Sequence, residues 1–175
     1  MDIGIVTTSQ QAGTFRRSER GPNLITLDYC LDRGTLTDDS PRVYLFTSDG
    51  IIKKIGGSAS RGGLRATMSF YLSSQQGAPG VPRFVIHHLI RREIDEGRQV
   101  QVHVIVSPSV LAQVSGLFEV TEAYVSSFKE MEDKCKLDYF NRENRYPDWN
   151  FQENATPYPE DLARLHNEYH QRRLG

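Results

Sequence analysis

The sequence contains only two cysteines among its 175 residues, Cys30 and Cys135, and it has no long apolar run. Because a transmembrane helix needs about 20 mostly apolar residues, no membrane span is expected. The two cysteines lack metal-ligand spacing, which favours free thiols in a reducing compartment. The first residues also lack the basic and apolar segments of a signal peptide. These absences predict a soluble, cytoplasmic protein with no membrane partner.

The chain also lacks a strong charge of either sign, since its 21 basic and 22 acidic residues give a net charge of −1. Overall composition therefore does not indicate a nucleic-acid-binding protein. Basic residues are nevertheless clustered at positions 16–20, 53–65, 91–92 and 172–173. Such clusters can contact phosphates without a high overall pI, and they can equally be solvated surface. Composition leaves both interpretations open.

Residue patterning predicts an α/β fold. Two β-rich runs, 42–47 and 51–57, flank Ser48-Asp49-Gly50, which is a strong hairpin signal. Alternating valines over 99–106 predict a third strand. Helices are expected near 64–72 and over 82–97, and a later long helix is expected to carry one apolar stripe made of Val120, Tyr124, Phe128, Met131 and Cys135.

The expected architecture is a small, largely antiparallel three-stranded sheet, the hairpin plus a third strand, flanked by helices. We predict a single domain over residues 1–175 with a core of about 41–150. Polar, turn-rich residues 1–40 are interpreted as an N-terminal arm. Residues 151–175 are interpreted as a C-terminal tail that closes with a short helix over 159–173.

The hairpin makes a specific prediction about Tyr44. A three-residue loop over 48–50 would place Tyr44 directly opposite Lys54, with Cβ atoms about 5 Å apart. An ammonium beside a phenol lowers the phenol pKa, as a general base working near neutral pH requires. A two-residue Asp49-Gly50 loop would instead shift the register and separate the pair. Tyr44 could also simply pack in the core, with Lys54 extending past it.

Val43-Tyr44-Leu45, followed by Lys54-Ile55-Gly56 ten positions later, resembles the two signature triplets of the GIY-YIG nucleases. Lysine in the second triplet is similar to a restriction-enzyme branch of that family. In that branch a catalytic arginine lies eleven residues beyond the lysine, which is Arg65 here. A metal-binding glutamate lies on a helix after the third strand, where Glu130 is the best-placed carboxylate. The resemblance covers about residues 41–150.

The resemblance implies a type II restriction endonuclease that cuts double-stranded DNA with a divalent metal. Tyr44, helped by Lys54, would deprotonate the attacking water, and Arg65 would hold the scissile phosphate. Glu130 would bind one Mg²⁺ or Mn²⁺ per active site. The chain offers alternatives for two of these roles, namely Arg61 for the arginine and Glu122, Glu132 or Asp133 for the glutamate.

Two further positions follow from the resemblance. Relatives often place His or Tyr four residues after the arginine, where this chain has Ser69, so Tyr71 is the nearest candidate. Pro147-Asp148-Trp149-Asn150 is similar to the family's Pro-x-x-Asn and indicates Asn150, with Asn144 and Asn141 as alternatives. Contacts to DNA are expected from a basic and polar set, made up of Arg16, Arg17, Lys53, Ser58 and Arg61.

Partners follow from the same interpretation. No separate DNA-binding domain is expected, so recognition would come from residues 1–40, the loop over 75–82 and the C-terminal tail. Cutting both strands of a palindromic site with one active site per chain predicts a homodimer. The glycines between 56 and 63 lack the Lys-Ser/Thr ending of a P-loop, so no nucleotide cofactor is expected. A non-catalytic nucleic-acid-binding module and a structure-specific repair nuclease are the alternative functions.

Overall fold

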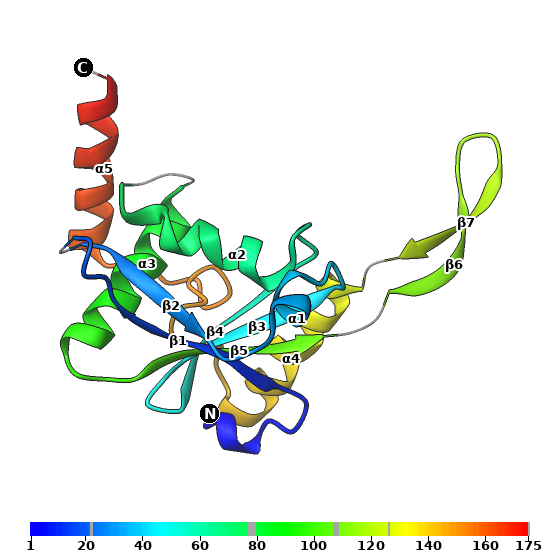
Figure 1. Ribbon diagram of the computed structural model, residues 1–175, viewed down its shortest axis with the longest axis horizontal. Coiled ribbons are helices and arrows are strands. Elements are labelled where there is room, and N and C mark those ends of the chain that lie inside the picture. The colour runs from blue at the N-terminus through cyan, green and yellow to red at the C-terminus, as the bar shows by residue number, and fades with distance from the viewer. Residues whose placement is uncertain (22, 77–79, 107–108, 126, 175) are drawn as a thin grey trace.

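A five-stranded antiparallel sheet, in the order β2-β1-β5-β3-β4, forms the centre of the computed structural model (Figure 1). The structure describes residues 1–21, 23–76, 80–106, 109–125 and 127–174. The five strands are β1 (Gln10–Arg17), β2 (Ile25–Tyr29), β3 (Arg42–Ser48), β4 (Ile51–Ser58) and β5 (Val100–Val106). The α/β class is confirmed, but the sheet is larger than the three strands expected. The supposed N-terminal arm supplies the two extra strands.

Five α-helices and two 3₁₀ turns accompany the sheet. They are η1 (Ile3–Ile5), α1 (Arg33–Thr37), α2 (Gly63–Leu72), η2 (Ser74–Gln76), α3 (Val81–Asp95), α4 (Phe128–Glu143) and α5 (Glu160–Leu174). The helices expected near 64–72, over 82–97 and over 159–173 are confirmed as α2, α3 and α5. No helix among the described residues is both long and apolar enough to cross a membrane.

Helices cover both faces of the sheet. Tyr44 and Phe46 of β3 lie on one face and pack against α2 and α3 through a set that includes Leu64, Met68, Ile86 and Ile90. Val43 and Leu45 lie on the other face, where Met131, Cys135 and Tyr139 of α4 cover them. Successive side chains of a strand point to opposite faces, and every residue of β3 is buried. Tyr44 is therefore held in a central strand with a helical layer on each side.

The hairpin turn contains two residues rather than three. Ser48 pairs directly with Ile51, which leaves Asp49 and Gly50 as the loop. Both loop residues have positive φ angles, 45° and 79°, as the tight hairpin turn that suits the twist of the strands requires. Glycine adopts that conformation without strain, and aspartate is among the side chains that tolerate it.

This turn changes the partner of Tyr44. The register shifts between Phe46 and Thr47, after which Phe46 pairs with Lys54 and Tyr44 pairs with Gly56. The predicted pairing of Tyr44 with Lys54 is therefore wrong. The total displacement is two residues, however, and an even displacement leaves both side chains on the same face. Lys54 becomes a diagonal neighbour of Tyr44 instead of its direct partner.

Residues 120–125 are a strand, which corrects the long helix expected there. Strand β7 (Val120–Val125) pairs with β6 (Val110–Ser115) in a separate two-stranded sheet, and α4 begins only at Phe128. Valine, threonine and tyrosine favour extended backbone, which explains why an apolar stripe that also suits a helix folds as a strand. Figure 1 shows this β6–β7 hairpin, hereafter the arm, projecting away from the central sheet.

Candidate active site

A pair of tyrosine hydroxyls lies at the edge of the sheet. The hydroxyl of Tyr44 in β3 and that of Tyr71 in α2 are 2.6 Å apart and hydrogen-bonded. Both side chains are buried, with exposed fractions of 6% and 5%. A Cβ atom at Gly56 would lie 2.4 Å from the Tyr44 ring, closer than any real contact. Glycine at this position therefore makes room for the phenol.

The next residue, Gly57, makes room for a carboxylate. A Cβ atom there would lie 2.5 Å from Oε2 of Glu132 and 2.9 Å from the ring of Phe128. Consecutive residues of a strand face opposite sides of a sheet. Tyr44 therefore approaches β4 from one face, while Glu132 of α4 approaches it from the other. The Gly56-Gly57 pair brings the phenol and the carboxylate to one short stretch of edge strand.

Tyr71 lines two hollows, and Gly57 lines the first of them. One, hereafter the tyrosine hollow, has a volume of about 340 Å³ and is lined by a set that includes Tyr44, Ser58, Thr67, Phe70, Tyr71 and Arg83. The other, hereafter the lysine hollow, has a volume of about 210 Å³ and is lined by a set that includes Lys54, Tyr71, Glu132, Lys136, Asn150 and Glu153. The described site thus contains phenols, amines, carboxylates and one guanidinium within a small region.

Burial controls the acidity of the two phenols. Burial raises the pKa of Tyr44 well above its usual value, and the neighbouring Tyr71 and Glu132 raise it further, against the positive charge of Arg83. Burial likewise raises the pKa of Tyr71 to about 12. Both groups are therefore protonated at neutral pH. The expectation that Lys54 lowers the pKa of Tyr44 is wrong, because the phenol is enclosed and the amine is not its direct partner.

Lys54 has the opposite tendency. Burial lowers the pKa of its amine, and the charge of Lys136 adds to that effect, whereas the carboxylates of Glu153 and Glu132 oppose it. A lysine with a lowered pKa carries a neutral amine at lower pH than usual, and a neutral amine accepts a proton. Burial thus shifts the amine toward its neutral, proton-accepting form and shifts both phenols away from theirs.

The carboxylates of the lysine hollow are held by Lys136. Its Nζ atom lies 2.7 Å from Oε1 of Glu132 and also contacts Oε1 of Glu153. No group of three or more His, Cys, Asp or Glu side chains is arranged to bind a metal ion among the described residues. Mg²⁺ nevertheless often uses only one or two protein carboxylates, completed by water and phosphate oxygens. Glu132, with Oε2 directed at Gly57, fits such a site.

Two predicted site residues do not reach either hollow. Arg65 is exposed on α2, and its charge acts on Tyr29 of β2. At about 100° per helical residue, six residues separate Arg65 from Tyr71 by about 120° around the helix axis. Glu130 is exposed in the first turn of α4 and lies about 160° from Glu132 around the helix axis. The structure thus favours Glu132, one of the alternatives that the sequence offered.

Asn150 lines the lysine hollow but uses its amide to hold the backbone. Its Oδ1 accepts a hydrogen bond from the N–H of Ile55 at 2.9 Å, and its Nδ2 donates to the carbonyl of Ile55 at 3.0 Å. The backbone N–H of Trp149 also donates to the carbonyl of Lys53 at 2.8 Å. These bonds pin the segment after α4 to strand β4. The structure therefore gives Asn150 a positioning role beside Lys54.

The predicted DNA-contacting residues have mixed surroundings. Three of them form ion pairs at 2.7 to 2.8 Å, namely Arg16 with Asp28, Arg17 with Asp95, and Lys53 with Asp148. Ser58 lines the tyrosine hollow and shares a hydrogen bond of 2.8 Å with Thr67. Arg61 is exposed beside it, on the loop between β4 and α2. The part of the 75–82 loop at residues 77–79 lies outside the described residues.

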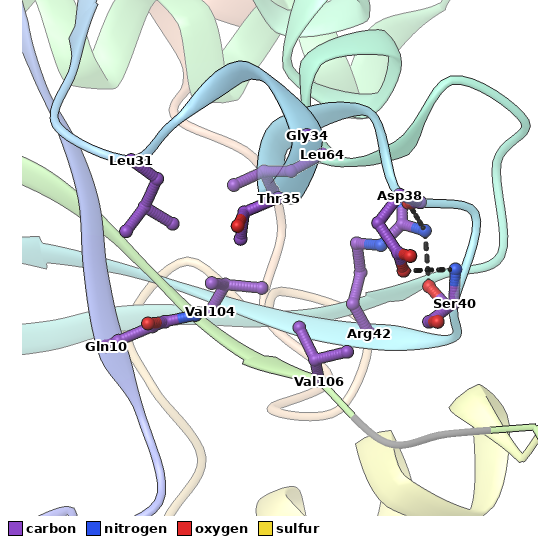
Figure 2. Close-up of a pocket in the computed structure, with 10 residues that line it drawn as sticks. All are labelled: Gln10, Leu31, Gly34, Thr35, Asp38, Ser40, Arg42, Leu64, Val104 and Val106. Carbon is purple, nitrogen blue, oxygen red and sulfur yellow. Dashed lines mark hydrogen bonds between the residues drawn. The ribbon is translucent and has the colours of Figure 1, made fainter.

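A cavity of about 390 Å³ lies between α1 and the end of β5, apart from the two glycines (Figure 2). Leu31, Leu64 and Val104 form much of its wall. The guanidinium of Arg42, which also lines this cavity, is buried. It donates hydrogen bonds to the backbone carbonyl of Asp38 at 2.7 Å and to that of Ser40. These contacts hold the segment before β3 in place. Arg42 therefore has a structural role.

The fold has counterparts among solved structures. No protein-family model matches the sequence, and neither does any curated protein. The structure of a mutant of bacteriophage T4 EndoII matches with a TM-score of 0.59, over 86% of this chain and 99% of that chain, at 12% sequence identity. The restriction endonuclease HPY188I in complex with product DNA matches with a TM-score of 0.49, over 84% of each chain, at 15% identity. At 12% identity, the first match shows a shared fold.

Proposed function

We propose that this chain is a divalent-metal-dependent endonuclease that hydrolyses phosphodiester bonds of double-stranded DNA. It would belong to the GIY-YIG type with lysine in the second triplet. The observation that carries this proposal is a cluster at strand β4: Tyr44 and Glu132 approach Gly56 and Gly57, and Tyr71 is hydrogen-bonded to Tyr44. Lys54 shares the lysine hollow with Tyr71 and Glu132. The fold shared with bacteriophage T4 EndoII supports it. The resemblance of the triplets around Tyr44 and Lys54 to the GIY-YIG signature triplets also supports it.

The roles follow from the acidities of the groups. Lys54, whose pKa is lowered by burial, would accept the proton of the attacking water. The protonated hydroxyls of Tyr44 and Tyr71 would donate hydrogen bonds that orient this water and a phosphate oxygen. Glu132 would hold one Mg²⁺ or Mn²⁺ per active site, which when bound neutralises charge on the phosphate oxygens. Asn150 would keep Lys54 in place through Ile55.

The two glutamates of α4 provide a matched test. Supercoiled plasmid is incubated with Mg²⁺ and either the unaltered protein, Glu132→Gln, Glu130→Gln or Lys54→Ala. We expect at least a hundredfold slower cleavage for Glu132→Gln and Lys54→Ala, and less than a threefold change for Glu130→Gln. Chelation with EDTA should stop the reaction. Loss of cleavage in Glu130→Gln alone would move the metal ligand to that residue. A plasmid left uncut by the unaltered protein would refute the endonuclease.

We further propose that cleavage is sequence-specific and carried out by a homodimer, as expected of a type II restriction enzyme that cuts both strands symmetrically. Sequencing of the plasmid ends should show one recurring site, and sedimentation with DNA should give two chains per duplex. Cutting confined to flaps or branches would instead identify a structure-specific repair nuclease. Binding without cutting would identify a non-catalytic module.

A further inference from the structure

Arg83 presents a guanidinium to the tyrosine hollow. It belongs to the first turn of α3 and lines this hollow together with Tyr44 and Tyr71. It is partly buried, and within the described part of the chain it forms no ion pair with a carboxylate. Other arginines do form such pairs, among them Arg16, Arg17, Arg91, Arg92, Arg98 and Arg145. Arg83 is thus a positioned cation that no carboxylate among the described residues neutralises.

Phe70 fixes the position of this guanidinium. The Cζ atom of Arg83 lies 4.3 Å from the centroid of the Phe70 ring. Stacking on a ring occupies the face of a guanidinium and leaves the N–H donors at its edge available. Those donors match the geometry of two phosphate oxygens. A guanidinium that is stacked on a ring with its N–H donors available is arranged as in an oxyanion-binding site rather than as in an ordinary surface arginine.

The charge of Arg83 reaches the reacting groups. Although burial dominates and raises the pKa values of both Tyr44 and Tyr71, the charge of Arg83 acts on each in the opposite direction. The same wall carries the hydroxyls of Ser58 and Thr67. A phosphate beside Arg83 would therefore also lie beside hydroxyl donors.

We propose that Arg83 holds a phosphate oxyanion of the DNA substrate in the tyrosine hollow, the role that the sequence resemblance assigned to Arg65. This inference rests on the proposed function. Arg65 is exposed and turned toward β2, whereas Arg83 faces the hydroxyl pair. Arg83 is then a catalytic residue that touches the substrate, and Phe70 is a positioning residue that acts through it.

Cleavage kinetics compare three arginines. A labelled duplex is cut under single-turnover conditions by the unaltered protein, Arg83→Ala, Arg65→Ala and Arg164→Ala, the last being an exposed control on α5. We expect Arg83→Ala to slow cleavage by about a hundredfold or more, as for loss of one oxyanion-holding donor, and Arg83→Lys to keep part of the activity. The other two should change the rate less than threefold. Loss in Arg65→Ala, with Arg83→Ala active, would overturn the proposal.

A second measurement does not depend on cleavage. In protein labelled with ¹⁵N-arginine, the Arg83 Nε–H signal is identified by its absence in Arg83→Lys and followed during titration with inorganic phosphate, then with duplex DNA without Mg²⁺. We expect a saturable shift that weakens in Phe70→Leu, a change that leaves Arg83 present but removes its ring contact. An unmoved signal in both titrations would refute the phosphate site. A shifted signal in a protein that never cuts DNA would refute the endonuclease but retain the site.

Discussion

Two β-hairpins of the molecule, β3–β4 and the arm, have opposite surroundings. In the β3–β4 hairpin every residue of β3 is buried between helical layers, and the hydroxyl of Tyr44 has one partner at 2.6 Å. In the arm, by contrast, Val110, Val120 and Tyr124 are mostly exposed, and Phe118 at the tip is 98% exposed. Both are antiparallel pairs, but the β3–β4 hairpin has a two-residue loop and a register shift, whereas the arm has a four-residue loop and an even register. The candidate site residues lie in the first, where packing on both faces fixes each side chain.

The arm differs from the site in its charge as well. One of its faces is made of Val110, Ala112, Val114, Thr121, Ala123 and Val125, none of which is charged. The other face carries Glu122, which accepts a hydrogen bond from Gln113 at 3.0 Å. Glu119 in the loop is also acidic, and strands β6 and β7 with their loop contain no lysine or arginine. Phosphate contacts are therefore expected at the sheet edge rather than along the arm.

Replacing a glycine with alanine should destabilise the protein strongly in the β3–β4 hairpin but only slightly in the arm. Gly56→Ala places a Cβ atom 2.4 Å from the Tyr44 ring, whereas Gly116→Ala in the arm meets only the carbonyl of Glu119 at 3.2 Å. We expect Gly56→Ala to lower the free energy of unfolding by about 3 kcal/mol and to abolish cleavage. Gly116→Ala should cost less than about 1 kcal/mol. Urea denaturation measures both, and equal midpoints would contradict the comparison.

The pH dependence of cleavage should report the buried hairpin. A protonated Lys54 cannot accept a proton, and its protonated fraction falls as the pH rises through its pKa, which burial lowers. The single-turnover rate should therefore rise about tenfold per pH unit until that pKa is reached, and then level off. The plateau should begin below the pH at which an ordinary lysine titrates. A rate that keeps rising past that pH would assign the proton to another group.

Removing single hydroxyls should sharpen the difference between the hairpins. Tyr44→Phe or Tyr71→Phe leaves the partner hydroxyl without its hydrogen bond, at a cost of about 1–2 kcal/mol. The double variant should cost less than the sum of the two, because it leaves no unpaired hydroxyl. In the arm, Tyr124→Phe should change stability by less than about 0.5 kcal/mol, since Tyr124 is exposed. Thermal or urea denaturation of the unaltered protein, the two single variants of Tyr44 and Tyr71 and their double variant completes the double-mutant cycle.

Polar substitution at the tip of the arm should have the smallest effect. Leu117→Ser with Phe118→Ser removes two almost fully exposed side chains, so the stability of a single chain should stay within about 0.5 kcal/mol. Denaturation at two protein concentrations measures this. A larger loss that shrinks on dilution would show that the tip is buried against a second copy of the chain.

The Asp-Gly turn between two β-rich runs predicted the β3–β4 hairpin, and a helix was expected near 64–72 after the basic loop. Apolar periodicity predicted β5 and α3, because both pack on the core with regular spacing. It missed β1 and β2, whose buried positions, including Ala12, Phe15 and Leu27, lie among polar residues and turns. It also placed the start of α4 too early, because one apolar stripe suited both β7 and the helix.

The site was predictable only where helical phase or motif spacing constrained it. Tyr44, Lys54 and Tyr71 were singled out and do line the two hollows. On α4, Met131, Cys135 and Tyr139 face the sheet, and Glu132 lies on the Cys135 side of Met131 whereas Glu130 lies on the other. Helical phase therefore prefers Glu132 to Glu130. No pattern indicates Arg83, because its contact with Phe70 joins two different helices. The register of Tyr44 depends on the length of the hairpin loop. The sequence Ser48-Asp49-Gly50 is compatible with a two-residue or a three-residue loop, and the structure has the two-residue loop.

At Gly56 and Gly57 only the backbone of strand β4 lies between the phenol of Tyr44 and the carboxylate of Glu132. Burial is the main cause of the raised pKa of Tyr44, and the negative charge of Glu132, carried by a helix on the other face, adds to it. A substitution of Glu132 on α4 therefore changes the acidity of a phenol that the helix does not cover.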